Sequence, residues 1–123
     1  MKLRTRGNSI RLRLEQHEIK NLVTQGAITE SIAFAPNQSF KYTLAASDNG
    51  EFSSKYQNGE IRIEIPLSLA KGWSESEEEG IYQTLNPNTD FEVKLAVEKD
   101  FQCLHKRPDE DESGLFPNPK AGN

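Results

Sequence analysis

The fold of this chain is decided first by residues 2–14, which read Lys2-Leu3-Arg4-Thr5-Arg6-Gly7-Asn8-Ser9-Ile10-Arg11-Leu12-Arg13-Leu14. Charged and apolar side chains alternate on both sides of Gly7-Asn8, which indicates two strands joined by a two-residue turn. In that register Arg4 lies opposite Arg11, and Leu3 lies opposite Leu12. One face of the predicted hairpin is therefore apolar. The other, which we call the basic face, carries five cations: Lys2, Arg4, Arg6, Arg11 and Arg13.

The basic face needs relief from its own repulsion, because like charges opposite each other across a strand pair are destabilising. A bound anion, acidic side chains from elsewhere in the chain, or open solvent could supply it. Arginine presents a planar fork of donors that binds phosphate or carboxylate oxygens in pairs. We therefore predict that all five cations bind an anionic small molecule, such as a phosphate-containing one, or an acidic protein segment. The internal alternatives are Glu60, Glu64, Glu92, Glu98 and the run Asp109-Glu110-Asp111-Glu112.

Length and charge bound the class of protein. The 123 residues suffice for one domain with its own core, and we place a β-rich domain at 1–107 and an acidic, proline-containing arm at 108–123. The net charge of −4 disfavours nucleic acid as a partner without excluding a local site, because that affinity comes from neutralising many phosphates.

Cysteine content and hydropathy suggest a compartment. Cys103 is the only cysteine, so no intrachain disulfide forms and nothing points to an oxidising compartment. Charges recur at every second position near the start, unlike a signal peptide, and no segment has the ~20 apolar residues that span a bilayer. We expect a cytoplasmic protein that does not bind membranes.

Alternating and helical patterns continue along the chain. Residues 15–25 have helical spacing and end at Gly26. Residues 67–73 suggest a short helical turn or loop that closes one end of the core, with Leu67, Leu69 and Trp73 packed as one patch. The remaining patterns predict strands at 28–34, 40–46, about 52–56, 60–65, 81–85 and 91–98, separated by turn sequences. No internal repeat is evident. We predict an α+β, mainly β chain: an antiparallel meander sheet or small barrel of about seven or eight strands with one or two short helices.

The arm has its own signal. Its acidic run is followed by Leu115 and Phe116, two apolar residues that suit a docking anchor better than a solvated tail. The competing hypothesis is therefore a self-associating or autoinhibited interaction protein, in which this arm docks on the basic face of its own chain or of a neighbour. A homo-oligomer would be one result.

Two stretches and the segment that follows them together resemble a known family. The opening hairpin, together with Val97-Glu98-Lys99-Asp100-Phe101-Gln102-Cys103-Leu104 and the later Phe116-Pro117-Asn118-Pro119, resembles an uncharacterised family of small bacterial proteins, a domain of unknown function. The resemblance covers nearly the whole chain. It implies a bacterial cytoplasmic protein with an ordered tail, and it brings no activity, cofactor or catalytic residue.

An enzyme is the third hypothesis. If Glu60, Arg62 and Glu64 faced into a closed barrel, the chain would resemble the triphosphate-tunnel enzymes, metal-dependent phosphoanhydride hydrolases with charged interiors. Their opening pattern of alternating glutamates is absent here, and small barrels are normally filled by apolar side chains. Cys103, His105 and His17 lack the pair spacing of a zinc site. We expect a noncatalytic module and predict no catalytic residue, metal ligand or cofactor.

Overall fold

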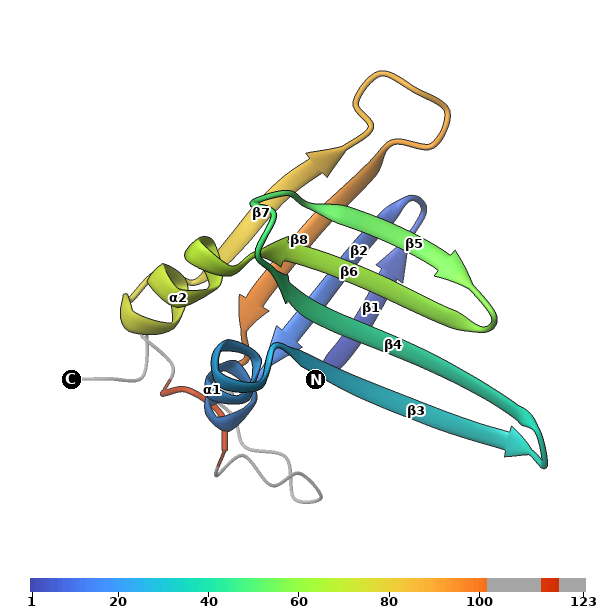
Figure 1. Ribbon diagram of the computed structural model, residues 1–123, viewed down its shortest axis with the longest axis horizontal. Coiled ribbons are helices and arrows are strands. Elements are labelled where there is room, and N and C mark those ends of the chain that lie inside the picture. Colours follow the sequence, from blue (N-terminus) through green and yellow to red (C-terminus); the bar gives the residue numbers. More distant parts are fainter. Residues whose placement is uncertain (102–113, 118–123) are drawn as a thin grey trace.

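The computed structural model describes residues 1–101 and 114–117, in which four β-hairpins and two helices follow one another (Figure 1). Their order is hairpin, helix, hairpin, hairpin, helix, hairpin. The elements are β1 (Lys2–Arg6), β2 (Ser9–Leu14), α1 (Gln16–Gln25), β3 (Ala27–Ala35), β4 (Gln38–Ser47), β5 (Ser53–Gln57), β6 (Glu60–Pro66), α2 (Leu67–Glu75), β7 (Gly80–Leu85) and β8 (Val93–Lys99).

The mainly β class, the eight strands and the two short helices are as predicted, whereas the way the hairpins join differs. The first sheet has the order β1-β2-β8-β7 and the second the order β3-β4-β6-β5. Each hairpin is antiparallel, but β2 pairs in parallel with β8, and β4 with β6. The sheets are therefore mixed and do not form a meander or, over the described residues, a closed barrel. Turn sequences specify only which neighbouring strands pair, and each helix carries the chain from one sheet to the other.

The fold contains a repeat that the sequence did not reveal. Elements β1-β2-α1-β3-β4 and β5-β6-α2-β7-β8 have the same order, and exchanging the two halves converts one sheet order into the other. Residues 10–14 read Ile-Arg-Leu-Arg-Leu and residues 61–65 read Ile-Arg-Ile-Glu-Ile. In the first sheet Arg11 lies between Arg4 and Ala96, and in the second Arg62 lies between Lys55 and Thr43. Each sheet thus takes one hairpin from each half.

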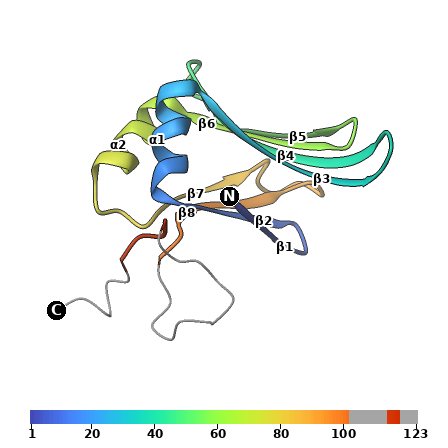
Figure 2. The same ribbon diagram turned by 90° about the horizontal axis from the view of Figure 1, so that it is seen from below.

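The core lies where the two sheets and the helices meet. Figure 2 shows the sheets one above the other, with both helices at the same end. The largest fully buried side chains come from both sheets and both helices: Trp73, Leu12, Leu14, Leu22, Leu44, Ile63, Ile65 and Val97. Trp73 is 1% exposed and closes the core as expected, whereas Leu69 points outward. Phe91 precedes β8 rather than joining it and is 63% exposed.

Local capping sets the limits of α1. Glu15 and Glu18 form a capping box, in which each carboxylate accepts a backbone N–H of the other residue. Gly26 ends the helix with φ +94°, a left-handed conformation that favours glycine, and its N–H donates to the carbonyl of Leu22. The helix therefore begins and ends where the sequence predicts.

A buried charge cluster joins the start of the chain to the second sheet. The terminal ammonium of Met1 donates to the carboxylates of Glu18 and Glu30, the latter at 2.7 Å, and the Tyr42 hydroxyl donates to the Met1 carbonyl at 2.9 Å. Burial alone would lower the pKa of this ammonium, but the two carboxylates raise it above its ordinary value.

The described part of the arm packs on the domain. The N–H of Gln16 donates to the carbonyl of Gly114, and its side-chain amide donates to that of Leu115, whose side chain is 5% exposed. Phe116 forms an isolated parallel β-bridge with Phe101, and the centroids of their rings lie 5.9 Å apart. The acidic run 109–112 lies outside the described residues. No helix of the described chain is long and apolar enough to cross a membrane.

We predict that Ile63→Ala lowers the free energy of unfolding by about 2–5 kcal/mol, because it leaves a cavity at a core position that is 1% exposed. Urea denaturation measures the change. The matched control is Ile32→Ala on β3, where the side chain is 47% exposed and the loss should be well under 1 kcal/mol. Equal losses at both positions would contradict this packing.

Candidate functional site

The first hairpin has the register that the sequence predicts. Arg4 pairs with Arg11, Lys2 with Arg13, and Arg6 with Ser9, so the five cations share one face. The parallel pairing with β8 and the antiparallel pairing with β7 extend this face across four strands. Three cross-strand rows result. They read Lys2, Arg13, Glu98, Gly80; then Arg4, Arg11, Ala96, Tyr82; then Arg6, Ser9, Lys94, Thr84.

Two acidic side chains, one in β8 and one just after it, form ion pairs with three of the five cations. Glu98 Oε1 accepts Arg11 Nη1 at 2.8 Å and lies 3.4 Å from Arg13 Nε, and the Glu98 side chain is 6% exposed. Lys2 Nζ lies 3.0 Å from Oδ2 of Asp100, which is also buried. That Oδ2 accepts no well-directed hydrogen bond from the described residues, so this contact is electrostatic rather than directional. Part of the basic face is thus neutralised internally.

Tyr82 completes the cluster around Glu98. Its hydroxyl donates to Glu98 Oε2 at 2.7 Å. Burial, this hydrogen bond and the Glu98 charge raise the pKa of Tyr82 to about 12. Burial alone would raise the pKa of Glu98, but the Tyr82 hydrogen bond and the Arg11 charge hold it below its ordinary value. Glu98 therefore stays ionised and holds three side chains in place.

Gly80 leaves the space that the Tyr82 hydroxyl occupies. A Cβ at position 80 would lie 2.7 Å from the Val97 carbonyl oxygen and 2.9 Å from both Glu98 Cγ and Tyr82 Oη. Gly80 pairs directly with Glu98 across the sheet. A side chain here would therefore push apart the cluster that positions Tyr82.

Arg4 and Arg6 differ from the other three cations. Both are exposed, and neither forms an ion pair with any residue in 1–101 or 114–117. With Arg11, Ser9 and Thr5 they line a hollow of about 250 Å³. Three arginines therefore line a space large enough for a phosphate group.

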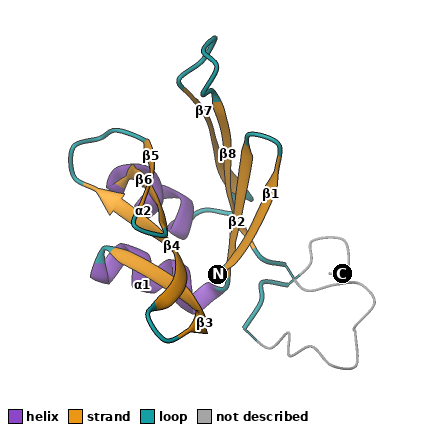
Figure 3. Ribbon diagram, turned by 90° about the vertical axis from the view of Figure 1, so that its right-hand side faces the viewer, coloured by secondary structure: helices purple, strands orange, loops and turns teal. Residues whose placement is uncertain are grey.

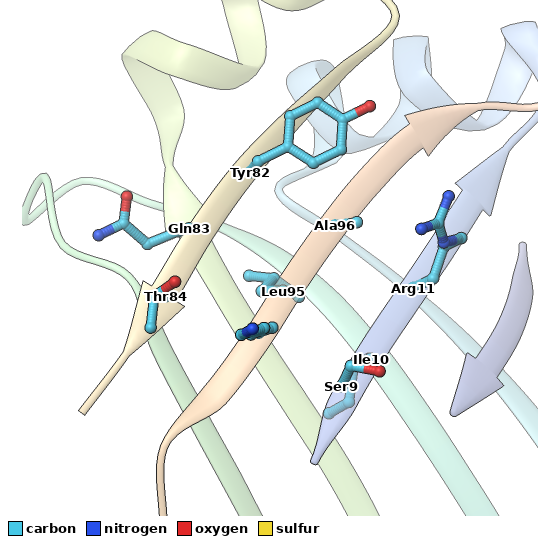
Figure 4. A pocket seen from close by; sticks show the side chains of 9 residues that line it. Ser9, Ile10, Arg11, Tyr82, Gln83, Thr84, Leu95 and Ala96 are labelled. Carbon is cyan, nitrogen blue, oxygen red and sulfur yellow. The ribbon is translucent and has the colours of Figure 1, made fainter. Parts of the chain in front are cut away.

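A second hollow of about 350 Å³ adjoins the first on the same face. Ser9 and Arg11 line both hollows, and Tyr82, Thr84 and Lys94 line only the second. Figure 4 shows Arg11 on β2 and Tyr82 on β7 on either side of Ala96, which lies on β8 between them. Because the Ala96 side chain is short, it leaves the space above β8 open at this point.

The other proposed internal partners lie elsewhere. Glu64 accepts hydrogen bonds from Arg62 and Ser53, which lower its pKa, and Glu60 accepts one from the Thr43 hydroxyl at 2.6 Å. Both belong to the second sheet. Glu92 accepts the N–H of Asn88 within its own loop. Of the acids named from the sequence within the described chain, only Glu98 contacts the basic face. Asp100 was not anticipated.

One hollow between the sheets is lined mainly by apolar and aromatic residues. It has a volume of about 400 Å³ and is lined by Ile10, Ile61, Val93, Tyr56 and Phe91, together with Ser54, Lys55 and Asn86. Glu60, Arg62 and Glu64 alternate with the core residues Ile63 and Ile65 and so lie on the outer face. The alternating charges of β6 therefore do not face the space between the sheets, whereas the triphosphate-tunnel hypothesis requires that they do.

Of the three residues considered as metal ligands, the structure describes only His17. Cys103 and His105 lie outside the described residues, and Nδ1 of the exposed His17 lies 3.9 Å from Oε1 of Glu15. Within 1–101 and 114–117, no three His, Cys, Asp or Glu side chains come close enough to hold a metal ion.

Sequence reasoning named Glu98 as one possible partner of the basic face but did not predict that Tyr82 lies beside it. Tyr82, Lys94 and Glu98 lie far from the hairpin in the chain, and no turn signal indicates that β8 pairs with β2. The alternation of Lys94, Ala96 and Glu98 on one side of β8 was the available signal. It assigns these residues to one face without saying which strand lies beside them.

One family model matches the chain, over residues 1–120, and it describes a family of unknown function, DUF7009. No curated protein sequence and no solved structure matches.

We predict that Gly80→Ala lowers the free energy of unfolding by about 1–3 kcal/mol, because the new methyl overlaps the Val97 carbonyl and the Tyr82–Glu98 hydrogen bond. Gly72→Ala is the matched control. Nothing lies within 4 Å of a Cβ there, and alanine should stabilise α2 by up to about 1 kcal/mol. Chemical denaturation of both variants measures the change in the free energy of unfolding, which should be negative for Gly80→Ala and positive for Gly72→Ala. An unchanged free energy of unfolding in Gly80→Ala would contradict the close packing.

We also predict that Glu98→Gln lowers the pKa of Tyr82 from about 12 toward its ordinary value of 10.0, since the neutral amide no longer opposes tyrosinate formation. Ultraviolet titration of tyrosinate, with Tyr82→Phe subtracted, measures the shift. The raised pKa also means that the contribution of Tyr82 to stability is present below pH 10.0 and is lost as the pH rises through about 12. An unchanged Tyr82 pKa in Glu98→Gln would show that burial alone causes the shift.

Proposed function

The chain belongs to a family of unknown function, DUF7009, and we propose that it is a noncatalytic module that binds an anionic ligand on its basic face. The observation that carries this proposal is the hollow shared by Arg4, Arg6 and Arg11. Arg11 is already held by Glu98, so its side chain is positioned before a ligand arrives. Such preorganisation reduces the cost of ordering a binding site.

Charge favours occupation of this hollow by an anion. Arg4 lies directly opposite Arg11, and Arg6 is two residues away on the same face of β1. Glu98 offsets only part of this charge, and the paired cations repel each other across the strands. An oxyanion bound between them would relieve the repulsion and form charge-assisted hydrogen bonds. The acidic net charge of the whole chain limits this attraction to the local site.

The second candidate is a self-associating or autoinhibited protein whose arm competes for the basic face. Its support is the docking of Leu115 against Gln16 and the backbone hydrogen bond from Phe116 to the Asp100 carbonyl at 2.8 Å. Asp100 also contacts Lys2. The described arm therefore reaches the end of the basic face, although its apolar anchor packs beside the face rather than on it.

The enzyme hypothesis receives less support from the geometry. A tunnel hydrolase would need acidic metal ligands and basic phosphate clamps facing one enclosed space. Here the acidic and basic side chains of β6 lie on the outer face of the second sheet. The anion-binding proposal requires no such enclosure.

We predict that Arg4→Glu weakens binding of inorganic pyrophosphate by about tenfold or more at low salt, because a charged hydrogen-bond donor contributes roughly 1.5–3 kcal/mol. Isothermal titration calorimetry of the full chain measures the affinity. Added salt should weaken binding by the wild-type chain as well, because the site is exposed.

Lys55→Glu is the matched control. Lys55 lies opposite Arg62 on the edge strand of the second sheet, in the position that Arg4 has in the first. It should leave pyrophosphate affinity nearly unchanged. Equal loss in both variants would indicate a general charge effect, and absence of pyrophosphate binding by the wild-type chain would remove the proposal. Leu115→Ala tests the second candidate, which predicts tighter pyrophosphate binding or altered assembly.

A further inference from the structure

We propose that the anionic ligand is a nucleoside phosphate, with its phosphate between Arg4, Arg6 and Arg11 and its base in the adjoining hollow over Ala96. This inference rests on the proposed anion-binding function and adds the chemistry of the group beside the anion. Its basis is the position of Tyr82, which lies exposed on the far side of a hollow that begins at the arginines.

The two hollows adjoin at Ser9 and Arg11, which line both. A molecule with its anionic group at Arg4 and Arg6 and its other end over Ala96 would therefore pass over these two residues. The volumes are about 250 and 350 Å³. A phosphate matches the smaller hollow, which is rich in arginine. The larger one suits a bulkier group that is less charged than the phosphate.

The walls of the larger hollow suit a planar ring. Tyr82, Ala96 and Arg11 lie in one cross-strand row, on β7, β8 and β2 respectively. The outer two strands of this trio are roughly 10 Å apart, because neighbouring strands are spaced by about 4.8 Å. Figure 4 shows Tyr82 and Arg11 on either side of Ala96, so a heterocycle over Ala96 would lie between an aromatic and a guanidinium side chain, both of which bond to Glu98 at one end of the hollow. Both groups stack on nucleobases.

Tyr82 is held ready for this role. Its side chain is an exposed large apolar group, 55% accessible, yet its hydroxyl is fixed by the 2.7 Å hydrogen bond to Glu98. Gly80 leaves room for that arrangement, and Arg11 binds the same carboxylate from the opposite side. The ring thus presents a surface whose orientation needs little further ordering on binding.

Polar groups beside the ring could read a sugar or a base edge. Ser9, Lys94 and Thr84 lie side by side in the third row and all line the hollow. The Ser9 hydroxyl donates to the Arg6 carbonyl at 2.6 Å and keeps its capacity to accept. Lys94 is exposed and forms no ion pair with a residue in 1–101 or 114–117.

The second sheet provides a comparison within the same molecule. Its corresponding row is Lys55, Arg62, Thr43 and Thr29, where threonine replaces the aromatic residue. The Thr43 hydroxyl donates to Glu60, and Arg62 pairs with Glu64. Two acids contact this row, which contains no aromatic residue. Arginines without an ion pair to a described residue, a short side chain on the central strand and an aromatic side chain beyond it are thus combined only on the first of the two sheets.

The test measures the affinity of the full chain for inorganic phosphate and for the 5′-monophosphates of adenosine, guanosine, cytidine and uridine. We expect at least one nucleotide to bind about tenfold more tightly than phosphate. Tyr82→Leu should abolish that advantage and leave phosphate affinity unchanged, whereas Tyr82→Phe, which keeps the ring, should retain most of it. Ala96→Leu fills the floor of the hollow and should act like Tyr82→Leu. It serves as an independent variant if Tyr82→Leu does not fold.

The outcomes separate this inference from the proposed function. If phosphate and all four nucleotides bind equally, or if neither variant affects the nucleotide advantage, the nucleoside assignment is wrong and anion binding stands. If no anion binds, both are wrong. A short single-stranded RNA distinguishes the source of the nucleoside phosphate: tighter binding than any mononucleotide, with a steeper salt dependence, assigns a polymer end or segment. Weaker binding assigns a free nucleotide.

Discussion

The parallel pairing of β2 with β8 is the constraint on which the rest of this structure depends. It joins the first hairpin of the chain to the last, and without it both would be isolated two-stranded ribbons, which are marginally stable in water. The pairing of β4 with β6 does the same for the two middle hairpins. Because α1 and α2 each carry the chain from one sheet to the other, neither half of the chain completes a sheet by itself. Figure 3 shows the result, with β1 and β7 at the two edges of one sheet.

The same pairing explains how the hairpin tolerates its charge. Strand β8 brings Glu98 beside Arg11 and Arg13, and the chain just beyond it brings Asp100 to Lys2. These acids pair with Arg11 and Arg13 on β2, which has a neighbouring strand on each side, and with Lys2 at the start of β1. Arg4 and Arg6 lie on the edge strand β1, and charges there also hinder pairing with another sheet edge. The arginines on β1 can protect this sheet edge and also bind an anion. A small ion in the hollow has no strand that could pair with β1.

The two sheets differ despite their equivalent topology. On the outer face of the second, Arg62 is matched by Glu64, and Glu60 by the Thr43 hydroxyl. On the first, the position that corresponds to Glu64 is Arg13, and within the described residues its ion-pair partner is Glu98 of β8. One repeated architecture therefore carries a face near neutrality and a face with excess positive charge. The difference arises from a few side chains on β1, β2 and β8, because the backbone pairing is the same in both.

The sequence by itself determined the local structure of this protein. Alternation around Gly7-Asn8 specified the hairpin and its register, Gly26 ended the first helix, and the stripe of Ile61, Ile63 and Ile65 marked a strand, because turn chemistry and side-chain period act between near neighbours. Only the tertiary structure decided which hairpins share a sheet, which acids meet the arginines and that Tyr82 faces Arg11 across Ala96. In the first sheet those contacts join residues more than 70 positions apart, such as Arg11 and Tyr82. The alternation of a strand states which side chains share a face but not which strand will lie beside it.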